Sequence, residues 1–471
     1  MKGRVSEHRN TDTPRQFLDV TYQSLGFEQG VLLDAVSIPN TELNEHWVDK
    51  GDWLSLAAAI GAEKIFFVNN DPVIIFCAQE NSDDTELLEL YRKYWCMARP
   101  QCLFIALPGE LRVYSLNQAP VKGEAEWKET KPLDVVTKVV DVAENLKAYR
   151  REQVETGQLF QEKFFGDIGQ RADKQLIQDL KYVRKALLDE GLESRHAHAL
   201  IGRSIFIRYL EDRKILPSDY FVSVAKQKTE WLDELNREYD QLIHSTAASD
   251  RHYYRVLGNK DFTYALFEQL AEDFNGDMFP RDHEEDDAVT QLHLDILSKF
   301  LLGDADPNQP ALFLWAYDFE IIPTDLISNI YEEFYHADND DDKGTHYTPS
   351  VLVEYVLHAV LNEKNLPNNP KILDPACGSG IFLVEAFRRI VRYRVQQTGQ
   401  HLDSNELRSI LKNQIVGIEI NPEAIRVTAF SLYLALLHYQ DPPYIRANPR
   451  LPHLIFRSDV DGQDNFGILV N

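Results

Sequence analysis

The chain has 471 residues and a formal net charge of −26, with 44% hydrophobic and 26% charged residues. This length exceeds one ordinary domain, and the balance is that of a globular protein, so we expect several domains with separate cores. There is no apolar signal core, no run near the ~20 residues of a membrane helix, and no metal-ligand or disulfide spacing among the four cysteines. These absences exclude the secreted and membrane classes and favour a reducing cytoplasm without a membrane partner.

Residues 1–20 are expected to form a flexible tail, and residues 21–135 a small α/β domain. Apolar or alternating runs predict strands, and the sequence Asn-Asn-Asp-Pro between two of them predicts a turn. The expected strands are Lys64–Val68, Val73–Cys77, Cys102–Ala106 and Leu111–Leu116, and a helix is expected over Asp84–Tyr94.

Residues 136–340 are expected to form a helical domain. Apolar residues recur at helical spacing over Asp173–Leu188 and again over Ala197–Leu210. Acidic stretches at 284–287 and 338–342 are interpreted as solvated linkers. The second stretch lacks the glycine and the downstream glutamate of a calcium loop, so no metal site is assigned.

From residue 341 to 471 helices alternate with short apolar strands, which is typical of a parallel α/β sheet. Strands are expected at Lys371–Leu373 and Gln414–Glu419. The expected helices are Ser350–Leu361, Ile381–Val395 and Pro422–Leu437.

The segment Ile372-Leu-Asp-Pro-Ala-Cys-Gly-Ser-Gly-Ile-Phe-Leu383 joins a strand to a helix through two glycines, Gly378 and Gly380. Such a turn brings the backbone close to a ligand and presents the free N–H groups of a helix start. On the glycines alone, a nucleotide-type site and a purely structural turn remain equal alternatives.

Two further segments flank this turn. Glu419 ends an apolar strand just before Asn-Pro, where an acid commonly binds two ribose hydroxyls, although a solvated strand-end glutamate is the alternative. Thr348 and Pro349 predict a helix start, with Thr348 as N-cap and Pro349 in the first turn.

Taken together, these segments resemble the N6-adenine DNA methyltransferases of type II-like restriction–modification and phage-defence systems, over residues 344–471. The resemblance implies a Rossmann-like methyltransferase domain that binds S-adenosylmethionine. It places Tyr347, Thr348 and Pro349 against the methionine part, and Asp374, Ala376, Gly378 and Gly380 in the cofactor loop. It further places Glu419 on the ribose and Ile420 and Asp459 on the adenine.

The resemblance continues upstream. Arg203–Leu216, Phe274–Pro280 and Pro323–Phe334 are similar to the helical domain that precedes this site in large type II enzymes. The first domain is interpreted as a nuclease relic. Asp71 is a possible first acid of such a nuclease, but the only plausible Glu-x-Lys sequence, Glu126-Trp-Lys128, lies in a polar stretch, and we therefore predict no nuclease activity.

Family members continue with a strand and Asn-Pro-Pro-aromatic, which holds the flipped adenine. Here the expected strand is Phe466–Val470, followed by Asn471, so the catalytic motif is expected after Asn471 and no catalytic residue is assigned. The sequence Asp441-Pro-Pro-Tyr444 follows a helix and is interpreted as a connector.

The sequence therefore predicts the cofactor-binding portion of a bacterial, cytoplasmic DNA adenine-N6 methyltransferase that is inactive alone. The net charge of −26 counts against DNA binding by this chain alone, because phosphate contacts need Lys and Arg. Double-stranded DNA is expected to bind through a missing C-terminal recognition region, with a C-terminal methyltransferase fragment or restriction subunits as partners. The alternatives are a non-catalytic scaffold or cofactor-sensing subunit of a defence complex and, more weakly, a methyltransferase of small molecules or proteins.

Overall fold

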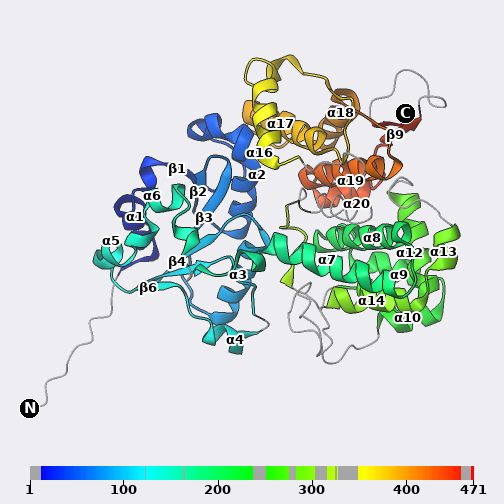
Figure 1. Cartoon of the computed structure of the whole chain (residues 1–471), viewed down its shortest axis with the longest axis horizontal. Coiled ribbons are helices and arrows are strands. Elements are labelled where there is room, and N and C mark those ends of the chain that lie inside the picture. Colours follow the sequence, from blue (N-terminus) through cyan, green and yellow to red (C-terminus); the bar gives the residue numbers. More distant parts are fainter. Residues whose placement is uncertain are drawn as a thin grey trace, which may run out of the picture. The chain divides into compact units, whose positions relative to one another are not determined.

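The computed structural model describes residues 12–121, 123–162, 165–236, 251–274, 283–302, 316–323, 326, 348–457 and 468–470. The chain divides into two compact units, Met1–Gln175 and Leu176–Asn471, which we call the N-terminal and C-terminal units (Figure 1). Each contains one sheet, and helices predominate in the second. No helix in the described ranges has the length and apolarity needed to cross a membrane.

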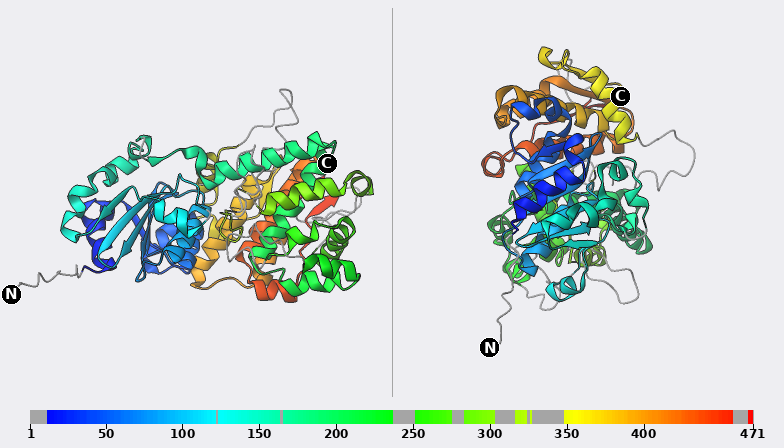
Figure 2. Two further views of the ribbon diagram at one scale, coloured as in Figure 1. Left: turned by 90° about the horizontal axis from the view of Figure 1, so that it is seen from below. Right: turned by 90° about the vertical axis from the view of Figure 1, so that its left-hand side faces the viewer.

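The N-terminal unit is built on a six-stranded sheet in the order β1-β2-β3-β4-β5-β6. The blue and cyan arrows in Figure 2 are strands of this sheet. All neighbouring strands are antiparallel except β3 and β4, which are parallel. The strands are β1 Val31–Asp34, β2 Lys64–Val68, β3 Asp71–Ala78, β4 Cys102–Leu107, β5 Glu110–Ser115 and β6 Asp134–Val136. The helices are α1 Pro14–Ser24, α2 Asn44–Ile60, α3 Asp84–Cys96, α4 Glu124–Glu129, α5 Val142–Asn145 and α6 Arg151–Glu155.

The four strands and the helix predicted in this region are confirmed, and the structure corrects two boundaries. Residues 14–20 of the expected tail belong to α1, because Phe17 and Leu18 are fully buried against the sheet. Residues after 135 also belong to this unit: Val142, Leu146 and Tyr149 lie in the same hydrophobic core as Phe104 of β4. The predicted start of the helical domain at residue 136 is therefore wrong, because these apolar side chains cover the sheet of the N-terminal unit.

The C-terminal unit contains the predicted helices of the middle region and the predicted alternation after residue 341. Its helices are α7 Ala172–Asp189, which begins at the end of the first unit, α8 Ser194–Asp212, α9 Ser218–Ala225, α10 Thr229–Leu235, α11 Tyr253–Val256, α12 Lys260–Asp273, α13 His283–Ala288, α14 Gln291–Leu302, α16 Ser350–Val360, α17 Ile381–Thr398, α18 Ser404–Gln414, α19 Pro422–Tyr439 and α20 Pro442–Ala447. Its strands are β7 Ile372–Asp374, β8 Ile415–Glu419, β9 Ile455–Arg457 and β10 Ile468–Val470.

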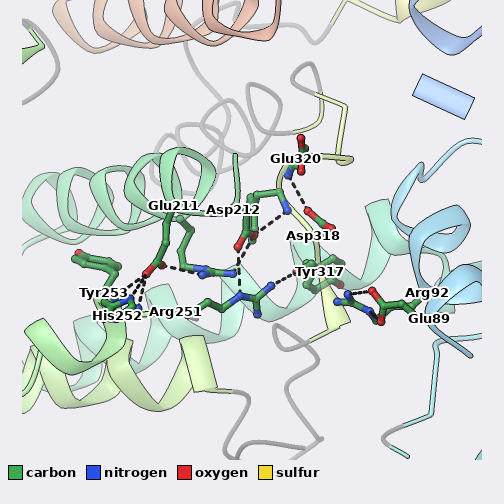
Figure 3. A network of polar contacts seen from close by, with 12 residues as sticks. Glu89, Arg92, Glu211, Asp212, Arg251, His252, Tyr253, Tyr317, Asp318 and Glu320 are labelled. Carbon is green, nitrogen blue, oxygen red and sulfur yellow. Dashed lines mark hydrogen bonds and ion pairs between the residues drawn. The ribbon is translucent and has the colours of Figure 1, made fainter. Parts of the chain in front are cut away.

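A buried ionic network holds the helical part of this unit together (Figure 3). Asp212, at the end of α8, accepts from the guanidinium groups of Arg208 at 2.9 Å and Arg251 at 3.2 Å, and from the backbone N–H of Phe319 at 3.0 Å. The Arg251 guanidinium also donates to the Tyr317 carbonyl at 3.1 Å. Segments far apart in sequence are thus joined through one carboxylate.

The second sheet is parallel, with strand order β7-β8-β10-β9. The predicted strands and helices of this region are confirmed to within a few residues, because each apolar run is bounded by turn-forming residues. The last strand in sequence, β10, lies inside the sheet between β8 and β9. The carboxyl ends of β7, β8 and β10 consequently meet at one edge.

Candidate functional site

The edge at the carboxyl ends of β7 and β8 brings the two predicted acids together. Asp374 pairs with Gly417 in the parallel register, so Glu419 lies two residues further along the neighbouring strand. One oxygen of the Asp374 carboxylate accepts the Ala376 N–H at 3.2 Å, which tightens the turn after β7. In open parallel sheets this edge is where ligands bind.

Between the two acids runs the predicted glycine loop. Gly378 and Gly380 have φ of +53° and +83°, a left-handed conformation that a side chain disfavours. A Cβ at Gly378 would meet nothing within 4 Å, so the backbone there borders open space. Gly380 is the N-cap of α17 and supplies no side-chain cap, which leaves N–H groups of the helix start available.

The Glu419 carboxylate ties this loop to the strand end. Its Oε2 accepts the Gly378 N–H at 2.9 Å, and its Oε1 accepts the N–H groups of Ile420 and Asn421 at 2.8 and 2.9 Å. The glutamate is therefore not a solvated strand-end residue, because it bonds the loop 41 residues earlier in the chain. Ile420 beside it is 74% exposed, which leaves its apolar surface free to cover a flat ligand.

Two residues of this loop environment were missed by the sequence analysis. Thr428 of α19 is fully buried and donates to the Gly378 carbonyl at 2.6 Å. Cys377 packs close enough to Gly417 that a Cβ there would lie 2.8 Å from its sulfur. Burial raises the pKa of the Cys377 thiol to about 12, and the Asp374 carboxylate acts in the same direction. The thiol consequently stays protonated at neutral pH and serves packing rather than nucleophilic chemistry.

Comparison with known proteins shows which family and which proteins this part of the chain resembles. Residues 323–448 match the N-6 DNA Methylase family. The adenine-specific methyltransferase PglX of Streptomyces coelicolor is 25% identical over 59% of this chain and 23% of its own length. The type II restriction enzyme and methyltransferase RM.Eco57I of Escherichia coli is 23% identical over 53% of this chain and 29% of its own.

The chain therefore corresponds to less than a third of these relatives' lengths. The solved complex of the type IIL restriction-modification enzyme MmeI with DNA is 18% identical, covering 64% of this chain and 40% of that one. Its TM-score of 0.35 does not establish a shared fold. The family assignment thus depends on the methylase region, residues 323–448, and on the curated relatives.

The remaining predicted residues of the methylase region divide into two groups. Thr348 and Pro349 precede α16, which packs against α17, and no contact joins them to the glycine loop among the described interactions. The predicted cap is wrong by one residue: Pro349 is the N-cap and makes no side-chain bond. Tyr347, and Asp459 beyond the methylase region, lie outside the described residues.

Two observations concern the expected catalytic motif. Strand β10 lies beside β8 with Val470 paired to Glu419, so its carboxyl end reaches the same edge as the glycine loop. Asn471 lies outside the described residues. Asp441 is instead the N-cap of α20, and Pro442–Tyr444 form its first turn after α19. The sequence follows a helix, as predicted, but it begins another helix rather than leading directly into a strand, and its non-catalytic role stays a prediction.

The nuclease candidates of the N-terminal unit do not converge. Asp71 begins β3 and lies 3.7 Å from the Arg99 guanidinium, whereas Glu126 and Lys128 lie on helix α4. Lys128 pairs with Glu124 one turn earlier. Among the described residues no three His, Cys, Asp or Glu side chains are placed to hold a metal ion. The absence of nuclease activity stays a prediction.

Proposed function

We propose that the C-terminal unit contains a Rossmann-like domain, from about residue 341, that binds S-adenosylmethionine for adenine-N6 methylation of DNA. The observation that carries this proposal is the loop between the two strand ends, held to Glu419 by the Gly378 N–H at 2.9 Å. The match of residues 323–448 to the N-6 DNA Methylase family supports the reaction class.

The residues present fit such a cofactor. The open space over Gly378 allows close approach of a ligand to the backbone. The free N–H groups at the start of α17 suit the methionine carboxylate, and Asp374 suits its ammonium group. The Glu419 carboxylate suits the ribose hydroxyls, and exposed Ile420 suits the adenine face.

When bound, the cofactor would supply an activated methyl group, and this chain's residues would hold it in place. A carboxylate has about four acceptor positions, and Glu419 already uses three for backbone N–H groups. One acceptor position therefore remains, on Oε2, for a ribose hydroxyl. Rate enhancement would come from orientation and electrostatics rather than from a protein nucleophile.

Replacing Glu419 by alanine is expected to weaken S-adenosylmethionine binding about 10- to 100-fold, since hydrogen bonds to a charged group contribute about 1.5–3 kcal/mol. Isothermal titration calorimetry measures the change, and Glu363→Ala, at an exposed glutamate that follows α16, serves as the matched control. Absence of any cofactor binding by the unaltered protein would contradict the proposed function. Equal binding by both variants would remove Glu419 from the site.

Transfer to DNA needs a group that holds the flipped adenine. The 471 residues contain one Pro-Pro-aromatic sequence, Pro442–Tyr444, and it begins a helix. We therefore propose that the domain from about residue 341 binds the cofactor. By itself, this polypeptide would transfer little methyl to DNA. The description of the matching family, N-6 DNA Methylase, supports DNA as the substrate, which we propose is bound with the help of further segments or subunits.

A methylation assay with labelled S-adenosylmethionine and adenine-containing duplex DNA is expected to show little transfer by residues 1–471. Transfer that is abolished by Asp441→Ala in a folded protein would contradict the connector interpretation. The second candidate, a cofactor-sensing subunit of a defence complex, rests only on the net charge of −26, which opposes unaided DNA contact, whereas the family match and the curated relatives support a methyltransferase. Efficient methylation by the unaltered chain would exclude that candidate.

A further inference from the structure

Thr428 is the residue through which helix α19 holds the glycine loop. Its hydroxyl donates to the Gly378 carbonyl at 2.6 Å, 50 residues away in the chain, and its side chain is 0% exposed. A threonine in a helix usually bonds a carbonyl of its own preceding turn. Ser431 in the same helix does so, donating to Val427 at 2.8 Å. The Thr428 contact is therefore a long-range one, unlike that of its neighbour.

The same side chain also meets the second loop glycine. A Cβ built at Gly380 would lie 2.5 Å from Thr428 Cγ2 and 3.0 Å from both its Cβ and its Oγ1. The hydroxyl thus holds one glycine by a hydrogen bond, and the methyl group packs against the other. Together these two contacts set how far the loop can move from α19.

Helix α19 is itself fixed by the helical part of the unit. The Phe430 ring, two residues after Thr428, packs on Phe206 of α8 at 5.7 Å between centroids. The Arg213 guanidinium, just after α8, donates to the Leu437 and Gln440 carbonyls near the end of α19. Helix α19, which packs on α17 and on the strands of the parallel sheet, is thus also held by residues outside that sheet.

We propose that Thr428 is a positioning residue that keeps the Gly378–Gly380 loop in its cofactor-binding conformation. This inference rests on the proposed function for the identity of the ligand. Glu419 restrains the Gly378 N–H from the side of β8, and Thr428 restrains the Gly378 carbonyl from the side of α19. The loop is thus held at both polar backbone groups of Gly378, from two different elements.

The test compares Thr428→Val, which keeps the shape and removes the hydroxyl, with Thr428→Ser, which keeps the hydroxyl. Titration with S-adenosylmethionine is expected to show about tenfold weaker binding for the valine variant, because the loop loses its hydrogen bond to α19 and occupies the binding conformation less often. The serine variant should bind within about threefold of the unaltered protein. Ser431→Ala, which removes a hydroxyl from the same buried helix face, should leave binding unchanged.

A second measurement tests whether Thr428 restrains the loop, which we call the clamp, in the absence of any ligand. Opening of the loop would expose buried Cys377, so Thr428→Val should speed its alkylation, whereas Cys77, Cys96 and Cys102 of the other unit should be unaffected. Valine binding and alkylation equal to those of the unaltered protein would overturn the inference. If the unaltered protein binds no cofactor, the proposed function fails, and faster Cys377 alkylation still tests the clamp.

Discussion

Replacing Asp212 by alanine is expected to lower the free energy of unfolding of the C-terminal unit by about 3–5 kcal/mol, the cost of breaking a buried ion pair from one side. The Asp212 side chain is 7% exposed, and its partners Arg208 and Arg251 are 3% and 9% exposed. The substitution would remove a carboxylate that neutralises part of the positive charge of both buried guanidinium groups. It would also leave the Phe319 N–H without its acceptor.

Urea unfolding, monitored by hydrogen exchange in peptides of α8 and α11, measures the change in the free energy of unfolding of these helices. Asp261→Asn is the matched control, because Asp261 is 71% exposed and pairs with Lys228 at 3.2 Å on the surface. That change should cost at most about 1 kcal/mol. Equal effects of the two substitutions would show that the network does not stabilise the unit.

Replacing Gly380 by alanine is expected to weaken S-adenosylmethionine binding by at least about a hundredfold, or ~2.8 kcal/mol. Two costs combine at this position. A φ of +83° strains any side chain by about 1–2 kcal/mol, and the new Cβ would lie 2.5 Å from Thr428 Cγ2, so the loop or α19 must move.

Gly399→Ala is the matched control for this effect. It lies at the other end of the same helix, has φ of +65°, and a Cβ there would meet nothing within 4 Å. Its substitution should cost only the backbone strain and leave cofactor binding intact. Calorimetric titration and thermal melting of both variants separate binding from stability. Equal binding by the two alanine variants would show that the Gly380–Thr428 contact is unimportant.

The sequence alone predicted the elements that local signals specify. The strand Lys64–Val68 and the helix starting at Asp84 were predicted correctly because apolar spacing and turn residues act within a few positions. The strand–glycine–helix segment at Asp374–Ile381 was equally readable, since left-handed turns need glycine. The exposed or solvated alternative for Glu419 could not be excluded from spacing.

Only the tertiary structure decided which residues meet. Glu419 accepts the N–H of Gly378, and Thr428 donates to its carbonyl. These two contacts join residues 41 and 50 positions apart in the chain. No periodicity encodes such contacts, because a buried threonine on an apolar helix face reads as ordinary core. The same reason explains why residues 14–20 were predicted as a tail rather than as part of α1, and why the buried ion pairs of Asp212 were not predicted. Local backbone preferences determine the elements, whereas packing and hydrogen bonding between distant segments determine the site.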